Sequence, residues 1–397
     1  MIRLSRNDRS LLSTWWFTVD RGLLAAILLL AGIGLLLSLA ASPAIAIRKG
    51  FRAFHFVERQ VVFIAVSMVV MLVVSAMTPR AIRRLALVLF LAMVAAMGAI
   101  LLAGDEINGA KRWVRIAGFT LQPSEFAKPA FVLLGAWGLA QARIRSDMPG
   151  LGFAVAAYLV LAALLVQQPD VGQTLLVTLV WGAMLIMAGQ PLALAAWVAA
   201  AGAAGVVVAC FTLPYVRLRF DRFWNPVPGD NSQSERALQS FIEGGFFGRG
   251  PGEGTIKTAL PDAHTDFIFA VVGEEYGILA CLGLVVLFGV IVLRVFARSL
   301  DEPDAFRRLA VTGLALMFGL QALINMAVNV GLLPPKGMTL PLISAGGSST
   351  VAIGIALGMI LGLTRRRADA ARYAQPPFRP TADMYMTPPE QKEAPIR

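Results

Sequence analysis

The sequence contains few charged residues, only two histidines and only two cysteines. Only 15% of its 397 residues are charged. With His55 and His264 as its only histidines, the chain cannot form an HExxH zinc site. Two lone cysteines, Cys210 and Cys281, give neither a disulfide framework nor a metal-binding pattern. The chain also lacks a GxxxxGK[ST] loop and a GxGxxG motif, so nucleotide hydrolysis and dinucleotide chemistry have no support.

Apolar residues, in contrast, are more abundant than a single soluble core of this length needs. They make up 57% of the chain, and the mean hydropathy is +0.70. Runs of about 20 apolar residues, enough to cross about 30 Å of hydrocarbon, recur along the sequence. We therefore predict an all-α polytopic membrane protein. Its ten expected transmembrane helices lie at about 22–42, 61–77, 85–103, 122–142, 151–167, 169–188, 191–211, 267–293, 309–330 and 343–364.

The spans divide the chain into a cytoplasmic N-terminal arm at 1–21, a ten-span membrane domain at 22–365 and a cytoplasmic tail at 366–397. The tail is rich in proline and polar residues and is expected to be disordered. The one long external loop, at about 212–266, joins spans 7 and 8. Its stretch "SQSERALQSFIEGG" predicts a short amphipathic helix, capped by Ser232 or Ser234 and ended at Gly244–Gly245. Long ordered loops are usually functional, so this loop is a candidate site.

The arginines set the predicted orientation, because cytoplasmic loops retain positive charge during insertion. Arginine-rich turns such as "MTPRAIRR" lie on the side of both termini, which we assign to the cytoplasm. The external side also carries many cations, although the rule predicts few there. The net charge of +11 suits anionic lipid headgroups as partners, or reflects insertion bias alone. Nucleic acid is not expected as a partner, because no basic segment joins aromatic residues in a soluble domain.

Polar side chains inside the predicted spans are functional candidates, because each is costly in a membrane unless it is paired or hydrated. Glu125 and Lys128 lie at i and i+3 on one helix face, either as a neutralising pair or with Lys128 facing a polar cavity. Gln321, Asn325 and Asn329 recur every four residues in the ninth span. This stripe indicates either interhelical hydrogen bonds or one wall of the same cavity.

Three cations surround Trp113 in the external turn "NGAKRWVRIAGFTLQPSE", namely Lys111, Arg112 and Arg115. Such a cluster suits a phosphate or pyrophosphate, with the indole covering a sugar or a lipid stem. The alternative is an interfacial tryptophan beside snorkelling basic side chains. Arg59 and Lys336 add external cations that are placed to converge on the same ligand. Asp170, between the fifth and sixth spans, belongs either to this region or to a simple proline-bearing turn.

The stretch "ALPDAHTDFIFAVVGEEYG" places Asp266 at the expected start of the eighth span, with Thr265 as its N-cap. Asp266 is then either a first-turn acid stabilised by the helix N-terminus or a general base for a sugar hydroxyl. Glu274 and Glu275 either support the cavity or pair with neighbouring helices.

Five segments together resemble the SEDS family of bacterial cell-wall proteins, which includes RodA and FtsW. They are "NGAKRWVRIAGFTLQPSEFAK", "QPDVGQTLL", "RALQSFIEGGFFGRGPGEG", "PDAHTDFIFAVVGEE" and "GLLPPKGMTLPLISAGGSS". Within the family, "KGMTLP" and the Gly273–Glu274–Glu275 triplet are similar to the division type, FtsW. Ala345 departs from the pattern, because many members have tyrosine there.

The resemblance implies a peptidoglycan glycosyltransferase that polymerises lipid II during septal cell-wall synthesis in cell division. It implies a location in the inner membrane at the division septum, with the active site facing the periplasm. The implied partners are a class B penicillin-binding protein, an FtsI-like transpeptidase, and other divisome membrane proteins. The alternatives are a lipid II flippase, a RodA-type elongation polymerase, or a scaffold whose polar stripes only hold helices together.

The resemblance also implies roles for individual residues. Asp266 takes the position of the family's essential aspartate and is the expected catalytic base. The expected substrate-binding residues are Arg59, Lys111, Arg112, Trp113, Lys128, His264, Thr265, Lys336, Ser348 and Ser349. The expected supporting residues are Glu125, Asp170, Glu274, Glu275, Asn325 and Asn329. No cofactor is evident from the sequence, and a divalent cation, Mg²⁺ or Mn²⁺, is compatible with a pyrophosphate substrate.

Overall fold

The computed structural model describes residues 10–104, 111–116, 119–144, 147–212, 217–218, 221, 223–225, 233–260, 262–335 and 337–365. Residues up to Arg365 belong to one compact unit. The predicted disordered tail and the position of Lys336 both lie outside the described residues.

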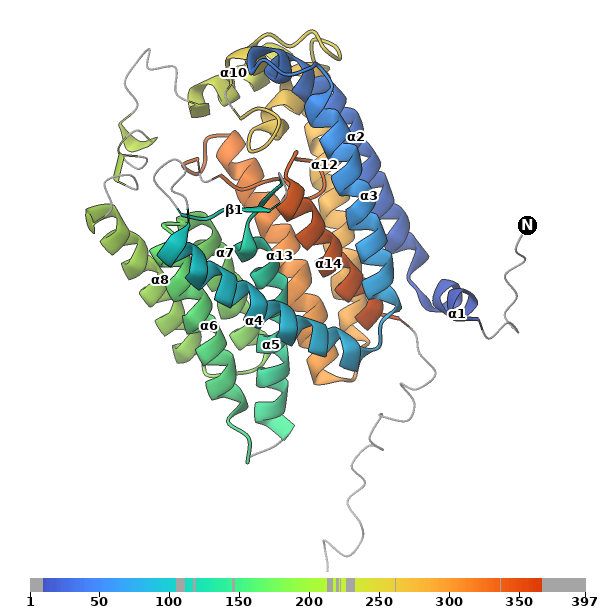
Figure 1. Cartoon of the computed structure of the whole chain (residues 1–397), viewed down its shortest axis with the longest axis vertical. Coiled ribbons are helices and arrows are strands. Elements are labelled where there is room, and N and C mark those ends of the chain that lie inside the picture. The colour runs from blue at the N-terminus through green and yellow to red at the C-terminus, as the bar shows by residue number, and fades with distance from the viewer. Residues whose placement is uncertain are drawn as a thin grey trace, which may run out of the picture. The chain divides into compact units, whose positions relative to one another are not determined.

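The predicted multi-pass helical fold is confirmed (Figure 1). Within the described residues, ten helices of 17 residues or more occupy the places of the ten predicted spans. They are α2 Arg21–Arg48, α3 His55–Ala76, α4 Pro79–Ala103, α5 Pro123–Ile144, α6 Gly150–Gln167, α7 Val171–Met187, α8 Leu192–Thr212, α12 Ile268–Leu300, α13 Ala305–Asn329 and α14 Gly347–Leu363. Six of these, α2, α3, α4, α6, α12 and α13, are long and apolar enough to cross a membrane. The remaining described helices, α1 Leu11–Thr18, α10 Gln233–Gly244 and α11 Ile256–Ala259, are short.

Several helix ends differ from the predicted ones because polar residues extend or shorten the apolar runs. The second span begins at His55 instead of 61, so that Arg59 lies inside α3. The last begins at Gly347 instead of 343, after an irregular stretch that contains buried Ser344. As predicted, α10 ends at Gly244, and Gly245 follows with φ of +57°. Ser234 lies inside α10, and Ser232 is outside the described residues.

Two features were not predicted. A small antiparallel hairpin pairs β1, Val114–Ile116, with β2, Phe119–Leu121. In addition, α12 is interrupted at Gly277, whose φ of +79° and ψ of +177° are not helical. Glycine adopts this conformation without steric cost, and most other residues do not.

The helix bundle has two ends. We call the end that carries Asp20, Arg294 and Arg365 the terminal end, and the opposite end, where α12 and α14 begin, the pocket end. At the terminal end Asp20 caps α2 and forms ion pairs with Arg294 at 2.8 Å and Arg298 at 2.8 Å. Burial raises the pKa of Asp20, but these hydrogen bonds outweigh it and hold the pKa at about 2. Arg365 joins the same end by donating to the carbonyl of Ala76.

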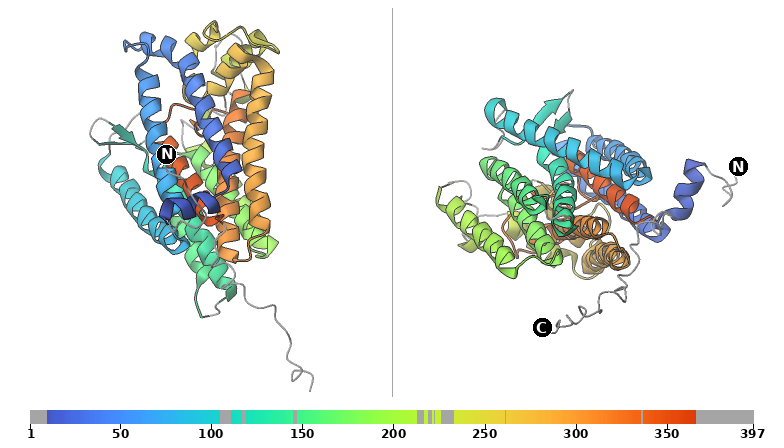
Figure 2. Two further views of the ribbon diagram at one scale, coloured as in Figure 1. Left: turned by 90° about the vertical axis from the view of Figure 1, so that its right-hand side faces the viewer. Right: turned by 90° about the horizontal axis from the view of Figure 1, so that it is seen from below.

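The central helix, α14, is held against α3 by small residues (Figures 1 and 2). Gly354 and Gly358 leave no room for a Cβ beside Ser67 and Met71 of α3. Small residues four apart allow two backbones to approach closely, as is common between membrane helices. The Ser67 hydroxyl also donates to Thr350 O at 2.8 Å. This packing fixes the start of α14, which carries Ser348 and Ser349, at the pocket end.

Candidate active site at the pocket end

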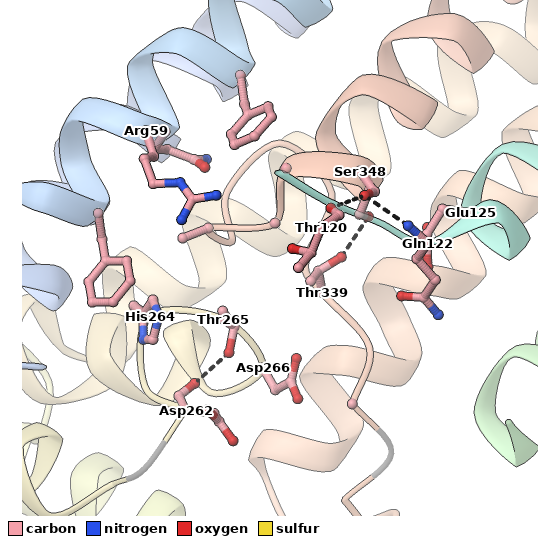
Figure 3. Close-up of a pocket in the computed structure, with 18 of the residues that line it drawn as sticks. Arg59, Thr120, Gln122, Glu125, Asp262, His264, Thr265, Asp266, Thr339 and Ser348 are labelled. Carbon is pink, nitrogen blue, oxygen red and sulfur yellow. Dashed lines mark hydrogen bonds between the residues drawn. The ribbon is translucent and has the colours of Figure 1, made fainter. Parts of the chain in front are cut away.

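A cavity of about 450 Å³ opens at the pocket end, where α3, β2, the start of α5, the segment before α12 and the segment before α14 meet (Figure 3). Nine residues predicted from the sequence line it: Arg59, Arg112, Trp113, Glu125, His264, Thr265, Asp266, Ser348 and Ser349. The structure therefore brings together residues that are far apart in the chain.

Asp266 lies in a turn that precedes α12, and not in the first turn of the helix as predicted. The helix begins at Ile268, and the hydroxyl of Thr265 donates to Asp262 O at 3.2 Å instead of capping it. The predicted N-cap role of Thr265 is therefore wrong. The cap comes from another helix, because Asn329 Oδ1 accepts the N–H of Ala270 at 3.0 Å. As a result the Asp266 side chain belongs to the cavity wall (Figure 3).

The amide stripe on α13, formed by Gln321, Asn325 and Asn329, hydrogen-bonds to the backbone of Asp266. The side-chain amides of Asn325 and Asn329 both donate to Asp266 O at 2.9 Å. Gln321 and Asn325 donate in the same way to Thr339 O at 3.2 Å and Met338 O at 2.6 Å. The stripe thus bonds to the backbone of two loops, and its three amides are not among the cavity-lining residues.

The segment before α14 forms a second support for the Asp266 turn. The Ser344 hydroxyl donates to Thr265 O, and the N–H of Ala345 donates to His264 O at 2.9 Å. Gln60 of α3 donates to Ser344 O at 3.1 Å. The sequence prediction missed Ser344 and Gln60, although a buried polar group in an apolar stretch was a usable signal for both.

His264 contributes an uncharged ring to the cavity. Its side chain is buried against Phe56, with ring centroids 4.6 Å apart. Among the described residues, Nδ1 of His264 has no hydrogen-bond partner. Burial lowers the pKa of His264 to about 4, and the positive charge of Lys49 acts in the same direction. At neutral pH this ring can therefore hydrogen-bond to a ligand but cannot supply a positive charge.

A wall of hydroxyl and amide groups lies across the cavity from His264 (Figure 3). The Ser348 hydroxyl donates to Thr120 O at 3.1 Å and accepts the N–H of Gln122 at 3.1 Å. Ser349 shares a 2.7 Å hydrogen bond with the hydroxyl of Thr339. Thr120, Gln122 and Thr339 were not predicted, because a single polar residue beside a span has no distinctive pattern. Such groups suit the hydroxyls of a sugar.

Arg112 is fixed in place by the turn between α6 and α7. Its guanidinium donates to Gln168 O at 2.8 Å and to Pro169 O, and it lies 3.8 Å from the Asp170 carboxylate. Asp170 also caps α7 through the N–H of Gln173. Burial raises the pKa of Asp170, and the charge of Arg112 opposes this effect. Asp170 therefore orients a cation at the cavity wall.

Lys128 does not reach the cavity wall. It is buried behind Glu125, forms an ion pair with that carboxylate at 3.0 Å and donates to Gln173 Oε1 at 2.6 Å and Gln321 Oε1 at 3.3 Å. Of the two alternatives for this pair, the structure shows the neutralising one. The Glu125–Lys128 pair connects α5, α7 and α13 beneath the cavity.

Other predicted residues lie away from the cavity. Lys111 is described but is not a lining residue, and Lys336 lies outside the described residues. Glu274 accepts the N–H groups of Ile256 at 2.7 Å and Lys257 at 3.0 Å. Glu275 forms an ion pair with Lys257. These two acids attach α11 to α12.

A protein-built metal cage is not seen in the part of the chain that the structure describes, since no three His, Cys, Asp or Glu side chains cluster there. A Mg²⁺ ion that is held mainly by substrate phosphates needs only one or two carboxylates. Asp262 and Asp266 both line the cavity and are the candidates for that role.

Comparison with known proteins identifies similar chains over nearly the whole length. The FtsW/RodA/SpoVE family model, described as a cell cycle protein, matches residues 21–369. A "Probable peptidoglycan glycosyltransferase FtsW" of Caulobacter vibrioides is 45% identical over 367 residues, which cover 92% of this chain and 94% of the relative. The protein of the same name in Halomonas elongata is 36% identical and covers 95% of this chain and 98% of its own.

Solved structures also match. One, described as "Structural coordination of polymerization and crosslinking by a peptidoglycan synthase complex", has a TM-score of 0.73 and 28% identity, and covers 90% of this chain and 99% of its own. The rod shape determining protein RodA of Thermus thermophilus has a TM-score of 0.66 and 26% identity, with 88% and 97% covered.

Proposed function

The chain belongs to the FtsW/RodA/SpoVE family, also called SEDS, and we propose that it is a peptidoglycan glycosyltransferase of the FtsW type. It polymerises lipid II into β-1,4 glycan strands during septal synthesis in cell division. The names of its relatives in C. vibrioides and H. elongata support this proposal. The observation that carries it is the Asp266 side chain in a cavity that combines cations, hydroxyl groups and a neutral histidine.

In the proposed reaction Asp266 acts as general base. Its carboxylate accepts the proton of the 4-hydroxyl of the acceptor GlcNAc, and that oxygen attacks the anomeric carbon of the donor sugar. The bond from this carbon to undecaprenyl pyrophosphate breaks, and the pyrophosphate leaves with the bonding electron pair. Attack from the face opposite the leaving group converts the α-linked donor into a β-linked product.

The cations of the cavity stabilise the charge that develops on the leaving pyrophosphate. Arg59 and Arg112 both line the cavity, and hydrogen bonds to the carbonyls of Gln168 and Pro169 orient Arg112 before the reaction. Donors that are fixed before the reaction need no reorganisation in the transition state. The hydroxyl wall around Ser348 suits the sugar groups, and Trp113 suits the face of a sugar ring or the lipid stem.

The proposed location is the cytoplasmic membrane at the division septum, with the pocket end facing the periplasm and both termini in the cytoplasm. The proposed partners are a class B penicillin-binding protein and other divisome membrane proteins. The similarity to a chain of a peptidoglycan synthase complex that coordinates polymerization and crosslinking supports a transpeptidase partner.

The test compares two carboxylates of the same cavity. Purified Asp266→Asn and Asp262→Asn proteins, each with the transpeptidase partner, are incubated with labelled lipid II, and the glycan polymer is measured. General-base catalysis is worth about 10²–10⁴-fold, so Asp266→Asn should lose that much activity. Asp262→Asn should lose less activity than Asp266→Asn, because Asp262 lines the cavity and can share in holding a substrate-bound Mg²⁺ but does not accept the proton.

Three outcomes separate the proposal from its rivals. Retained polymerisation by a folded Asp266→Asn protein would refute the assignment of the base. If that variant loses only lipid II translocation across vesicles, the chain is a flippase. If both variants lower the melting temperature without changing turnover per folded molecule, the cavity is a scaffold feature.

A further inference from the structure

An exposed apolar surface lies beside the break in α12, on the outside of the bundle and away from the cavity. It combines one flank of α10 with the loop that follows it. The side chains of Ile242, Phe246 and Phe247 are 79%, 69% and 82% exposed. Exposed apolar groups of this size on a protein surface mark an interaction site.

The three faces of α10 differ in character. Its buried face carries the small residues Ala237, Ser240 and Gly244. Its exposed residues form two adjacent stripes, and within each stripe the residues recur every four positions. The apolar stripe contains Leu238 and Ile242, and the polar stripe contains Glu235, Gln239 and Glu243. A helix with one apolar and one polar flank is typical of a helix that lies in the plane of a membrane interface.

The break in α12 fixes the position of the loop after α10 along the axis of α12. Since Gly277 interrupts the helix, the N–H groups of Ile278 and Leu279 bond to Gly245 O at 3.0 Å and Phe246 O at 3.3 Å. Phe246 and Phe247 therefore lie level with Ile278 and Leu279 of α12. Leu279 is itself 52% exposed, so that the apolar surface continues onto the side of a membrane-spanning helix.

Two independent residue counts place this level at the membrane boundary. Arg294 pairs with Asp20 and marks the boundary at the terminal end. About 20 helical residues cross the hydrocarbon, so the opposite boundary of α12 falls near Glu274. On α2 the same count from Arg21 reaches about residue 41. The two levels coincide in the structure, because Lys257 Nζ both donates to Ala40 O at 3.2 Å and pairs with Glu275.

We propose that Phe246, Phe247 and the apolar flank of α10 dock into the lipid leaflet at the pocket end. The aromatic side chains lie among the outermost acyl segments, and the polar stripe of α10 faces water. The occupant is lipid, because the surface is continuous with the lipid-facing side of α12 at the depth where hydrocarbon ends. The contact is hydrophobic, because the exposed side chains on this surface are Leu238, Ile242, Phe246 and Phe247. This inference does not depend on the proposed enzymatic activity.

The test uses fluorescent labels at matched positions of the full-length chain in lipid vesicles. Cys210 is replaced by serine, whereas Cys281 is buried and can remain. Single cysteines at Phe247 and Ile242 are labelled with bimane, and Gln239→Cys on the polar stripe is the control. The vesicles contain phosphatidylcholine alone or with added phosphatidylglycerol, and quenching is measured with doxyl-labelled lipid and with aqueous iodide.

We expect labels at Phe247 and Ile242 to be quenched several-fold more by doxyl lipid than the label at Gln239, and several-fold less by iodide. Adding phosphatidylglycerol or salt should leave these ratios unchanged. Equal iodide quenching at Phe247 and Gln239 would overturn the proposal. Protection of Phe247 that arises only when a transpeptidase partner is added would also overturn it, because the surface would then bind protein.

Discussion

Gly337, on the segment before α14, lies beside the Asp266 carboxylate. Its φ is +67°, and a Cβ added there would lie 3.6 Å from Asp266 Oδ2. The distance of 3.6 Å is an ordinary van der Waals contact, so Gly337→Ala acts mainly by straining the backbone directly beside the carboxylate, which a shift of this segment would relieve. Because a misplacement of about 1 Å can cost roughly 10²-fold in rate, we expect a loss of that order in lipid II polymerisation. Polymerisation rate and melting temperature are measured for the purified variant.

Gly50→Ala is the matched control for this prediction. Gly50 has a φ of +77°, and no described atom lies within 4 Å of a Cβ added there. The control carries the same strain, about 1–2 kcal/mol, without a contact to the carboxylate. Equal losses of activity in both variants would show that strain alone, and not its position beside Asp266, explains the effect.

At the residue scale the sequence could predict which charged groups gather, but not how they are held. Arg59, Arg112 and Asp266 line one cavity as expected, because costly polar groups in an apolar chain are distinctive. The hydrogen bond from the Ser344 hydroxyl to Thr265 O could not be predicted, since it depends on the tertiary approach of two loops. Lys128 was assigned to the substrate, whereas the structure gives it three protein partners instead.

At the scale of elements, α11 is attached to α12 by an ion pair that is almost entirely buried. The side chains of Lys257 and Glu275 are only 5% and 0% exposed. Removing one member leaves an uncompensated buried charge, which typically costs about 3–5 kcal/mol. Lys257→Met should therefore lower the melting temperature strongly, and Lys257→Met/Glu275→Met should recover most of the loss.

Arg249→Met is the control for the buried pair. Its ion pair with Glu243 is 37% and 35% exposed and should be worth less than about 1 kcal/mol. Thermal unfolding of the four proteins in one detergent gives the comparison. If Lys257→Met and Arg249→Met have the same melting temperature, the Lys257–Glu275 pair does not stabilise the attachment of α11 to α12.

The elements that sequence could predict are those whose signal is a long apolar run. The ten long helices of the described residues could all be predicted, because the hydrocarbon thickness sets the length of an apolar run. The break at Gly277 was missed, since glycine is common inside membrane helices and the cause of the break is tertiary. It lies where Gly245 and Phe246 of a distant loop supply the backbone hydrogen bonds that the helix loses.

For the whole molecule, the number of cations at the pocket end needs an explanation, because the positive-inside rule predicts few cations on the external side. Several are held by the folded protein: Arg48 donates to Thr258 O, Arg112 to Gln168 O and Arg236 to Ala259 O. Lys257 is buried in its ion pair. These cations join loops to one another, so their number does not argue against an external location for the pocket end. The arginines of short turns at the terminal end then determine the orientation.

The orientation can be tested with one cysteine at each end of the bundle. Glu253 is exposed near the pocket end, and Asp301 is exposed in the turn between α12 and α13 at the terminal end. With Cys210 replaced by serine, Glu253→Cys should react with a membrane-impermeant maleimide in cells whose outer membrane alone is permeabilised. Asp301→Cys should react only after the inner membrane is lysed, because arginine-rich turns are usually retained on the cytoplasmic side. The reverse pattern would place the cavity on the cytoplasmic side, where it could not extend glycan strands in the periplasm.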